Sequence, residues 1–206
     1  MLERILVWDL PTRVFHWSFA LSFAGAYLTA ESERYRDVHL ALGYVFAALL
    51  VFRLVWGLVG TRYARFSSFT FSVSAIVSYL KSLRQQQAQH FLGHNPAGAI
   101  AIFLLLGLGL VISLTGIGLD WEFGSVDWED FFAETHELSA NFMLLVVFVH
   151  IAGVIVSSYL HHENLARSML TGYKQGEATA AIQRSFVWLG VLMFVAMLVF
   201  LISYLN

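Results

Sequence analysis

The sequence contains no cysteine among its 206 residues. This absence excludes disulfide bonds, iron–sulfur clusters held by thiolates, and covalent attachment of haem through a CxxCH motif. Proline is also rare, and Pro11 and Pro96 both precede long apolar stretches. Proline suits the first turn of a helix, where its missing N–H is not needed. Both prolines therefore predict helix starts.

Charged residues are scarce as well. They make up 13% of the chain, whereas hydrophobic residues make up 58%, and the mean hydropathy is +0.69. This composition excludes an ordinary soluble protein and predicts an integral membrane protein. A helix needs about 20 apolar residues to cross a bilayer. Five stretches approach or exceed this length, namely 14–30, 38–60, 96–119, 137–160 and 186–205. We expect the first to be a retained span, because Asp9, Pro11 and Arg13 interrupt the N-terminus and no small-residue cleavage site follows.

Basic residues are unevenly distributed over the predicted loops. Nine lie at the N-terminus, between spans two and three, or between spans four and five: Arg4, Arg13, Arg62, Arg65, Lys81, Arg84, Arg167, Lys174 and Arg184. Only Arg34 and Arg36 lie on the other side. The positive-inside rule then predicts a cytoplasmic N-terminus and a periplasmic C-terminus. The expected outer loop, residues 120–135, is acidic and has no basic residue, which suits either a basic partner or a plain solvated loop.

Two histidines lie 14 residues apart near the fourth apolar stretch, His136 and His150. On an α-helix this spacing is close to four turns, so both rings project from nearly the same face, about 21 Å apart in depth. An ionisable ring within a membrane span is costly and indicates a function. His16 and His39 lie near the starts of the first two spans.

The predicted topology sorts these four histidines by depth. His39 and His136 form an outer pair, and His16 and His150 form an inner pair. Two imidazoles at one depth can bind a haem iron from both sides, so the set predicts two stacked haems whose irons have these four histidines as axial ligands. Such ligation leaves no open position on the iron and favours electron transfer. Taken singly, His16 and His39 can also be interfacial histidines.

Other residues of the spans fit a haem site. Arg53 lies 14 residues after His39, on the same helical face and at the depth of the inner pair. Its guanidinium can bind a haem propionate through a two-pronged contact. Arg13 is a second candidate, although it can instead be a snorkelling residue. Gly43, one turn after His39, leaves flat space beside a macrocycle, but small residues equally serve helix packing.

Four segments of the chain match a known pattern: RVFHW at Arg13–Trp17, GHNPAG at Gly93–Gly98, and the histidine-bearing segments His39–Gly57 and Thr135–Val154. Their resemblance is to the bacterial cytochrome b561 family and the related b-type cytochrome subunits of nickel–iron hydrogenases and formate dehydrogenases. It implies a di-haem bundle that carries electrons between a periplasmic partner or substrate and the quinone pool of the bacterial inner membrane. The periplasmic partner would be a c-type cytochrome or a dehydrogenase or hydrogenase subunit. The span at 186–205 departs from the usual four helices.

Related cytochromes bind quinone near the inner haem. His94 and Asn95 lie in the loop before the third span and can offer hydrogen bonds to a quinone carbonyl, although Asn95 is also a good helix N-cap. His161 and His162 end span four and can either relay protons or simply be solvated. Residues 67–90 predict an amphipathic helix on the inner membrane surface, with an apolar side formed by Phe71, Ile76, Tyr79, Leu80 and Leu83.

We therefore expect an all-α, multi-pass membrane protein with a single domain over residues 1–206. A di-haem four-helix bundle occupies about residues 8–160, joined by the surface helix and the fifth span. Its cofactors are two non-covalent haem b groups, and its partners are lipid and quinone, with no nucleic acid. It transfers electrons, and whether it is also a quinone oxidoreductase is left open. The alternatives are a histidine-lined metal-ion transporter, which expects acidic residues that these spans lack near the histidines, and an anchor for a soluble redox enzyme.

Overall fold

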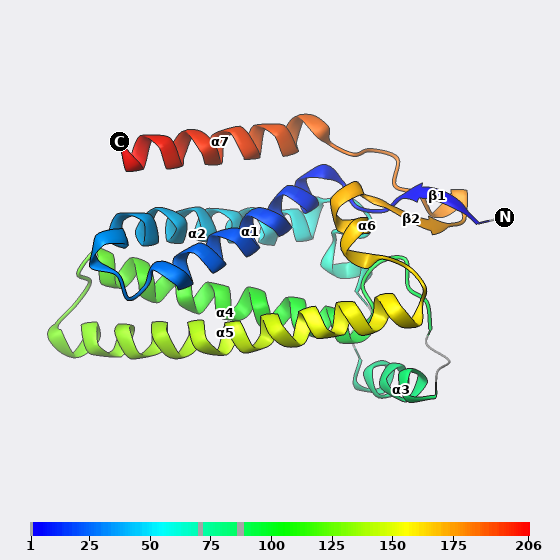
Figure 1. Ribbon diagram of the computed structural model, residues 1–206, viewed down its shortest axis with the longest axis horizontal. Coiled ribbons are helices and arrows are strands. Elements are labelled where there is room, and N and C mark those ends of the chain that lie inside the picture. The colour runs from blue at the N-terminus through cyan, green and yellow to red at the C-terminus, as the bar shows by residue number, and fades with distance from the viewer. Residues whose placement is uncertain (1, 70–71, 86–88) are drawn as a thin grey trace.

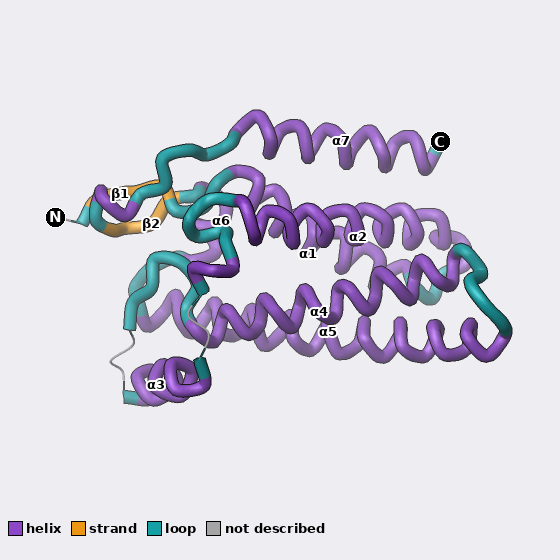
Figure 2. Tube along the Cα trace, turned by 180° about the vertical axis from the view of Figure 1, so that it is seen from behind, coloured by secondary structure: helices purple, strands orange, loops and turns teal. Residues whose placement is uncertain are grey.

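Five long helices lie side by side in the computed structural model, which describes residues 2–69, 72–85 and 89–206 (Figures 1 and 2). They are α1 (Leu10–Thr29), α2 (Arg36–Val59), α4 (Pro96–Asp120), α5 (Val126–Leu160) and α7 (Val187–Leu205). The main packing pairs are α1 with α2 and α4 with α5. Helix α2 also contacts α4, and α7 lies against α1 and α2. The bundle is long and narrow, and its two ends differ.

One end, which we call the strand pole, contains the N-terminus and all the small elements except one (Figure 1). These are strands β1 (Glu3–Leu6) and β2 (Tyr173–Gly176), helices α3 (Val73–Arg84) and α6 (Leu165–Thr171), and the 3₁₀ turns η2 (Phe66–Ser68) and η3 (Ala178–Ala180). The other end, the loop pole, contains η1 (Glu33–Tyr35), the α4–α5 connection at residues 121–125, and the C-terminus. Helices α1, α4 and α7 run from the strand pole to the loop pole, and α2 and α5 run back.

Four helical segments in the described part of the chain are long and apolar enough to cross a membrane. They are Glu33–Val59, Pro96–Asp120, Val126–Leu160 and Val187–Leu205. Helix α1 is not among them, and it carries Arg13, His16 and several hydroxyl side chains. Four of the five predicted spans thus have a counterpart by length and composition, while the spanning role of α1 stays a prediction.

The core of the bundle is rich in phenylalanine. Phe19 of α1 stacks on Phe46 of α2 with ring centres 4.0 Å apart, and Phe15 and Phe23 extend the same cluster. A side chain at Gly109 of α4 would meet both stacked rings at 3.3 Å, so glycine lets α4 approach them closely. By their positions along α1 and α2, the stacked rings lie between the level of His16 and that of His39. The core therefore separates the two histidine levels.

The prediction of an outer loop over residues 120–135 was wrong from Val126 onward, where α5 already begins. Asp127 and Glu129 occupy its first turn, where negative charge favours a helix N-terminus. The polar residues that looked like a loop therefore extend the helix. His136 lies ten residues inside α5 instead of opening it.

The all-α expectation also missed the two-stranded sheet. Strand β1 pairs antiparallel with β2, with Glu3 opposite Gly176 and Leu6 opposite Tyr173. Each strand has only four residues, and its partner is about 170 residues away in the chain, so no local sequence pattern predicts the pairing. The predicted surface helix is present as α3, shorter than expected. Phe71 lies outside the described residues.

Candidate functional site

In each of the two pairs predicted from depth, the histidine rings lie next to each other. The ring centres of His39 and His136 are 6.3 Å apart, and those of His16 and His150 are 6.5 Å apart. When two imidazoles share one iron, each nitrogen lies about 2 Å from the metal, which puts the ring centres about 6 Å apart. Both separations fit one metal ion between each pair.

In the pair at the loop pole, each ring has one nitrogen engaged. The Nδ1 of His39 lies 2.8 Å from the carbonyl oxygen of Ala26, and the Nδ1 of His136 lies 3.0 Å from that of Ile112. A carbonyl oxygen can only accept, so Nδ1 carries the proton and donates. Each Nε2 then keeps its lone pair, which is the tautomer that a metal-binding histidine needs. The hydroxyl of Thr115, 3.1 Å from Nδ1 of His136, supports the same orientation.

A cavity of about 400 Å³ adjoins this pair. Its volume is within the range of roughly 300–1,000 Å³ that cofactor sites show. Gly43 lines it, and a Cβ at Gly43 would meet no atom within 4 Å. Gly116 lines it from α4, and a Cβ there would come within 2.9 Å of the His136 ring. Glycine at these two positions keeps space for a flat group and for the ring.

The pair at the strand pole has a different environment. Nδ1 of His16 is enclosed and has no hydrogen-bond partner in the described part of the chain. Gly153, near His150 on α5, would meet no atom within 4 Å with an added Cβ. An enclosed polar atom without a partner indicates that a bound group completes this site.

Arg53 is a buried cation of this pole, with 4% of its surface exposed. Its guanidinium lies over the Phe66 ring at 4.5 Å, and its Nη1 has no hydrogen-bond partner among the described residues. A buried charge is costly unless it is paired. The carboxylate of a bound group would satisfy it, as a haem propionate would.

Arg13, the second propionate candidate, is partly engaged. Its Nη1 donates to the carbonyl oxygen of Leu170 at 2.6 Å, at the end of α6. The indole of Trp17 donates to the neighbouring carbonyl of Met169 at 3.3 Å. Nε of Arg13 is enclosed without a partner in the described residues. Arg13 thus ties α1 to α6, and its binding of a propionate stays a prediction.

His94 and Asn95 occupy different environments although they are adjacent in sequence. The His94 ring lies between Trp8 and Phe69, with ring-centre distances of 4.8 Å and 4.6 Å, and its Nδ1 is enclosed without a partner among the described residues. Burial, and next the Arg53 guanidinium, lower the pKa of His94 to about 3, so the ring is neutral near pH 7. Asn95 caps α4 by accepting from the Gly98 amide at 2.7 Å. A quinone contact of either residue stays a prediction.

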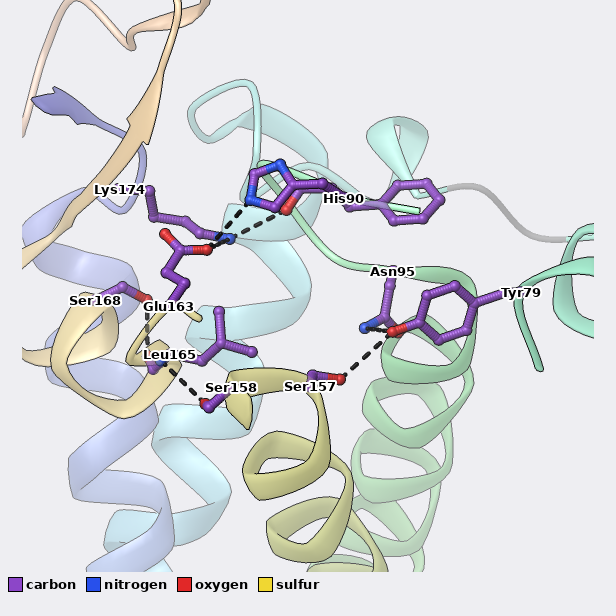
Figure 3. A network of polar contacts seen from close by, with 10 residues as sticks. Tyr79, His90, Asn95, Ser157, Ser158, Glu163, Leu165, Ser168 and Lys174 are labelled. Carbon is purple, nitrogen blue, oxygen red and sulfur yellow. Dashed lines mark hydrogen bonds and ion pairs between the residues drawn. The ribbon is translucent and has the colours of Figure 1, made fainter. Parts of the chain in front are cut away.

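Asn95 also belongs to a polar network at the strand pole (Figure 3). Its Nδ2 donates to the Tyr79 hydroxyl at 2.9 Å, and that hydroxyl lies 3.4 Å from Oγ of Ser157 on α5. Nearby, the buried Lys174 pairs with Glu163 at 3.2 Å. Burial lowers the pKa of Lys174, and the Glu163 carboxylate opposes that shift. Together these contacts hold α3, β2 and the end of α5 against the start of α4.

The sequence analysis did not identify Asp9 as a structural residue, yet it is fully buried. Its carboxylate accepts from the amide of Thr12 at 2.7 Å, from the indole of Trp56 at 3.2 Å, and from the hydroxyl of Thr61. Asp9 is thus the N-cap of α1 and also joins it to the end of α2. An aspartate two residues before Pro11 is a helix-start signal that could have identified the cap. No local sequence pattern, however, identifies Trp56 and Thr61 as its hydrogen-bond partners.

Within the described ranges, no three histidine, aspartate or glutamate side chains gather as a site for a metal ion. The four histidines instead form two separate pairs. Two opposed imidazoles beside a cavity suit an iron whose remaining ligands come from a macrocycle. The chemistry of the donor set therefore fits haem.

Comparisons with known proteins agree with this geometry. The sequence matches the family described as prokaryotic cytochrome b561 over residues 7–172. Similar proteins include the probable Ni/Fe-hydrogenase B-type cytochrome subunits of Azotobacter vinelandii and Rhizobium leguminosarum bv. viciae, 26% and 25% identical over 82% of this chain and 88% of theirs. That of Rhodobacter capsulatus is 21% identical over 82% of this chain and 81% of its own length.

No solved structure matches the chain. The family match covers α1, α2 and α5, which carry both histidine pairs, together with α4, and ends before α7. With its apolar helices, the match makes this chain a multi-pass bacterial membrane protein that binds haem b and transfers electrons. The chain therefore belongs to the prokaryotic cytochrome b561 family.

Proposed function

We propose that this protein binds two haem b groups and carries electrons across the bacterial inner membrane between a periplasmic redox partner and the quinone pool. The observation that carries the proposal is the presence of two histidine pairs, with ring centres 6.3 Å and 6.5 Å apart, at opposite depths of one bundle. Haem, when bound, supplies reversible one-electron chemistry, and ligation by two histidines leaves its iron without an open position.

The strand pole faces the cytoplasm in this proposal. The N-terminus and most loop arginines and lysines belong to that pole, whereas acidic residues flank the α4–α5 connection at the loop pole, with Asp120 ending α4 and Asp127 and Glu129 in the first turn of α5. The positive-inside rule assigns the basic side to the cytoplasm. Helix α1 then crosses as the first of five spans, and α7 ends in the periplasm.

The histidines and arginines have distinct tasks. His39 and His136 hold the iron at the loop pole through Nε2, because their Nδ1 atoms are engaged with main-chain carbonyls. His16 and His150 hold the iron at the strand pole. There Arg53 binds a propionate and offsets its charge, with Arg13 as the second arginine. Gly43 leaves room for the macrocycle at the loop pole.

Quinone exchanges electrons at the strand pole, close to the haem of His16 and His150. A second cavity, of about 410 Å³, lies at the end of α5, and its lining combines three apolar residues with Ser158, Tyr159, His162, Glu163 and Asn164. Across the same pole, the neutral His94 and the Asn95–Tyr79 pair offer hydrogen-bonding groups. Such groups orient a carbonyl and pass protons when a quinone is reduced.

The periplasmic partner is a hydrogenase-like enzyme. The similar proteins from Azotobacter vinelandii and Rhizobium leguminosarum bear the name of a hydrogenase subunit, which suggests this class of partner. The acidic loop pole supports electron exchange on that side, because it favours approach of a basic surface.

Haem quantitation with optical spectra tests the proposal. The protein, purified from membranes with its haem, should contain two haems per chain, and both should show low-spin spectra when oxidised and when reduced. A ratio of one haem per chain would contradict the two-site arrangement. A high-spin fraction that binds carbon monoxide would contradict ligation by two histidines.

A further inference from the structure

The cavity beside His39 and His136 has charged residues at its rim, at the loop pole, and the roles proposed so far do not involve them. Its lining includes three acidic residues, Glu33, Asp120 and Glu129, and one basic residue, Arg36. Arg36 lies three residues before His39 on α2, so both side chains project from the same helical face. Among the described residues that line the cavity, Arg36 is the one basic side chain, and it lies one turn from the proposed ligand His39, on its solvent side.

The present contact of Arg36 is weak. One of its terminal nitrogens lies 4.0 Å from Oδ1 of Asp120, and 64% of the Arg36 side chain is exposed. Exposed ion pairs of this kind contribute little to stability, because water screens the two charges. A guanidinium carries five N–H donors in a planar fork, which matches a carboxylate in two places. Arg36 can thus turn to a carboxylate within the cavity at little cost.

Asp120 does not depend on Arg36 for its position. Its Oδ2 accepts a hydrogen bond from the Tyr44 hydroxyl, and that hydroxyl accepts in turn from the Trp121 indole at 3.0 Å. Tyr44 lies on α2 and also lines the cavity. The carboxylate therefore stays at the rim whether or not Arg36 contacts it.

We infer that Arg36 binds a propionate of the haem held by His39 and His136, and that Asp120, fixed by Tyr44, sets the opposing charge beside that haem. This inference rests on the proposed function. A haem on these ligands has two carboxylates, and Arg36 is the basic residue of the cavity that can neutralise one of them. A positive charge near the iron favours the reduced state, and a negative charge favours the oxidised state. The two residues should therefore act on this haem in opposite directions.

The test uses the purified protein with its haems, and measures the midpoint potential of each haem and the rate at which each is lost to an excess of a haem-scavenging apoprotein. Arg36→Gln should lower the potential of the haem at His39 and His136, and that haem should leave about tenfold faster, since one charge-assisted contact is removed. Asp120→Asn should raise the same potential. The haem at His16 and His150 should change in neither variant.

Arg34→Gln is the matched control, because Arg34 lies two residues before Arg36 in η1, contacts the Tyr35 ring and does not line the cavity. Arg36→Lys keeps the positive charge but loses the planar guanidinium. The midpoint potential of the haem at His39 and His136 should therefore stay unchanged, while that haem should be lost somewhat faster than from the wild type. Arg36→Lys serves as the second variant if Arg36→Gln does not fold.

Two results would overturn the inference. In one, Arg36→Gln matches Arg34→Gln in both measurements while the wild type holds two haems; the proposed function then stands without this role for Arg36. In the other, Asp120→Asn lowers the potential, which refutes the opposing charge. A wild-type protein without a haem at His39 and His136 would instead refute the proposed function itself.

Discussion

His39 and His136 face each other with ring centres 6.3 Å apart, although they lie on different helices and 97 residues apart in the chain. Each directs Nδ1 at a main-chain carbonyl, of Ala26 and of Ile112. These carbonyls belong to helices α1 and α4. The backbone of two helices therefore orients the ligands supplied by the other two, and all four long helices of the family match take part in one site.

The first prediction concerns the pairing. His39→Ala and His136→Ala should each remove the haem at the loop pole, whereas His16→Ala and His150→Ala should each remove the haem at the strand pole, because one imidazole cannot keep the bis-histidine spectrum. Haem quantitation and reduced spectra measure this. His162→Ala, outside both pairs, should retain two haems. Loss of the same haem from both His136→Ala and His150→Ala would disprove the pairing.

The second prediction concerns Arg53. Arg53→Leu removes a buried positive charge beside the haem of His16 and His150, so reduction of that haem should become harder and its potential should fall. A tenfold change in the preference for the reduced form corresponds to about 59 mV for one electron, and we expect a shift of this order in a potentiometric titration. The exposed Arg65→Leu is the control. Equal shifts of both haems would show that Arg53 has only a structural role.

The third prediction separates two roles of Asn95. Asn95→Ala should impair electron exchange with a quinone analogue and leave both haem spectra intact. It should also cost about 1 kcal/mol, because the cap of α4 is lost. Asn95→Ser keeps a capping oxygen but lacks the Nδ2 donor to Tyr79, so it should be more stable than Asn95→Ala and still react slowly with the quinone analogue. If Asn95→Ala is silent and Trp128→Ala abolishes the quinone reaction, the site lies at the loop pole.

The fourth prediction concerns the stability provided by Asp9. Asp9→Ala removes the cap of α1 and leaves the Trp56 indole and the Thr61 hydroxyl unpaired in the interior. We expect a loss of about 2–4 kcal/mol in the free energy of unfolding. Denaturant unfolding in detergent measures it. Asp37→Ala, in the exposed first turn of α2, should change little. Equal stability of the two variants would show that the buried contacts of Asp9 contribute nothing.

The sequence predicted the helices and the depth of each histidine because both follow from local rules. A bilayer requires about 20 apolar residues per span, and the helical repeat places residues 14 apart on one face. The spacing of His136 and His150, with the alternating direction of spans, was thus enough to predict which rings could meet. The same rules did not predict features that lie outside the bilayer, where no apolar pattern is required. These features are the start of α5 at Val126 and the pairing of β1 with β2.

The choice of partners was decided by tertiary structure alone. Helical periodicity gives the face and the depth of Arg36, Asp9 or Lys174, but not the rotation of each helix against its neighbours. That rotation follows from packing around the Phe19–Phe46 stack and from close approach at Gly109. It brings Arg36 to Asp120, Asp9 to Trp56 and Lys174 to Glu163, over separations of 84, 47 and 11 residues. The sequence by itself therefore determined which histidines could pair, and the packing of the bundle determined which charged side chains lie around each pair.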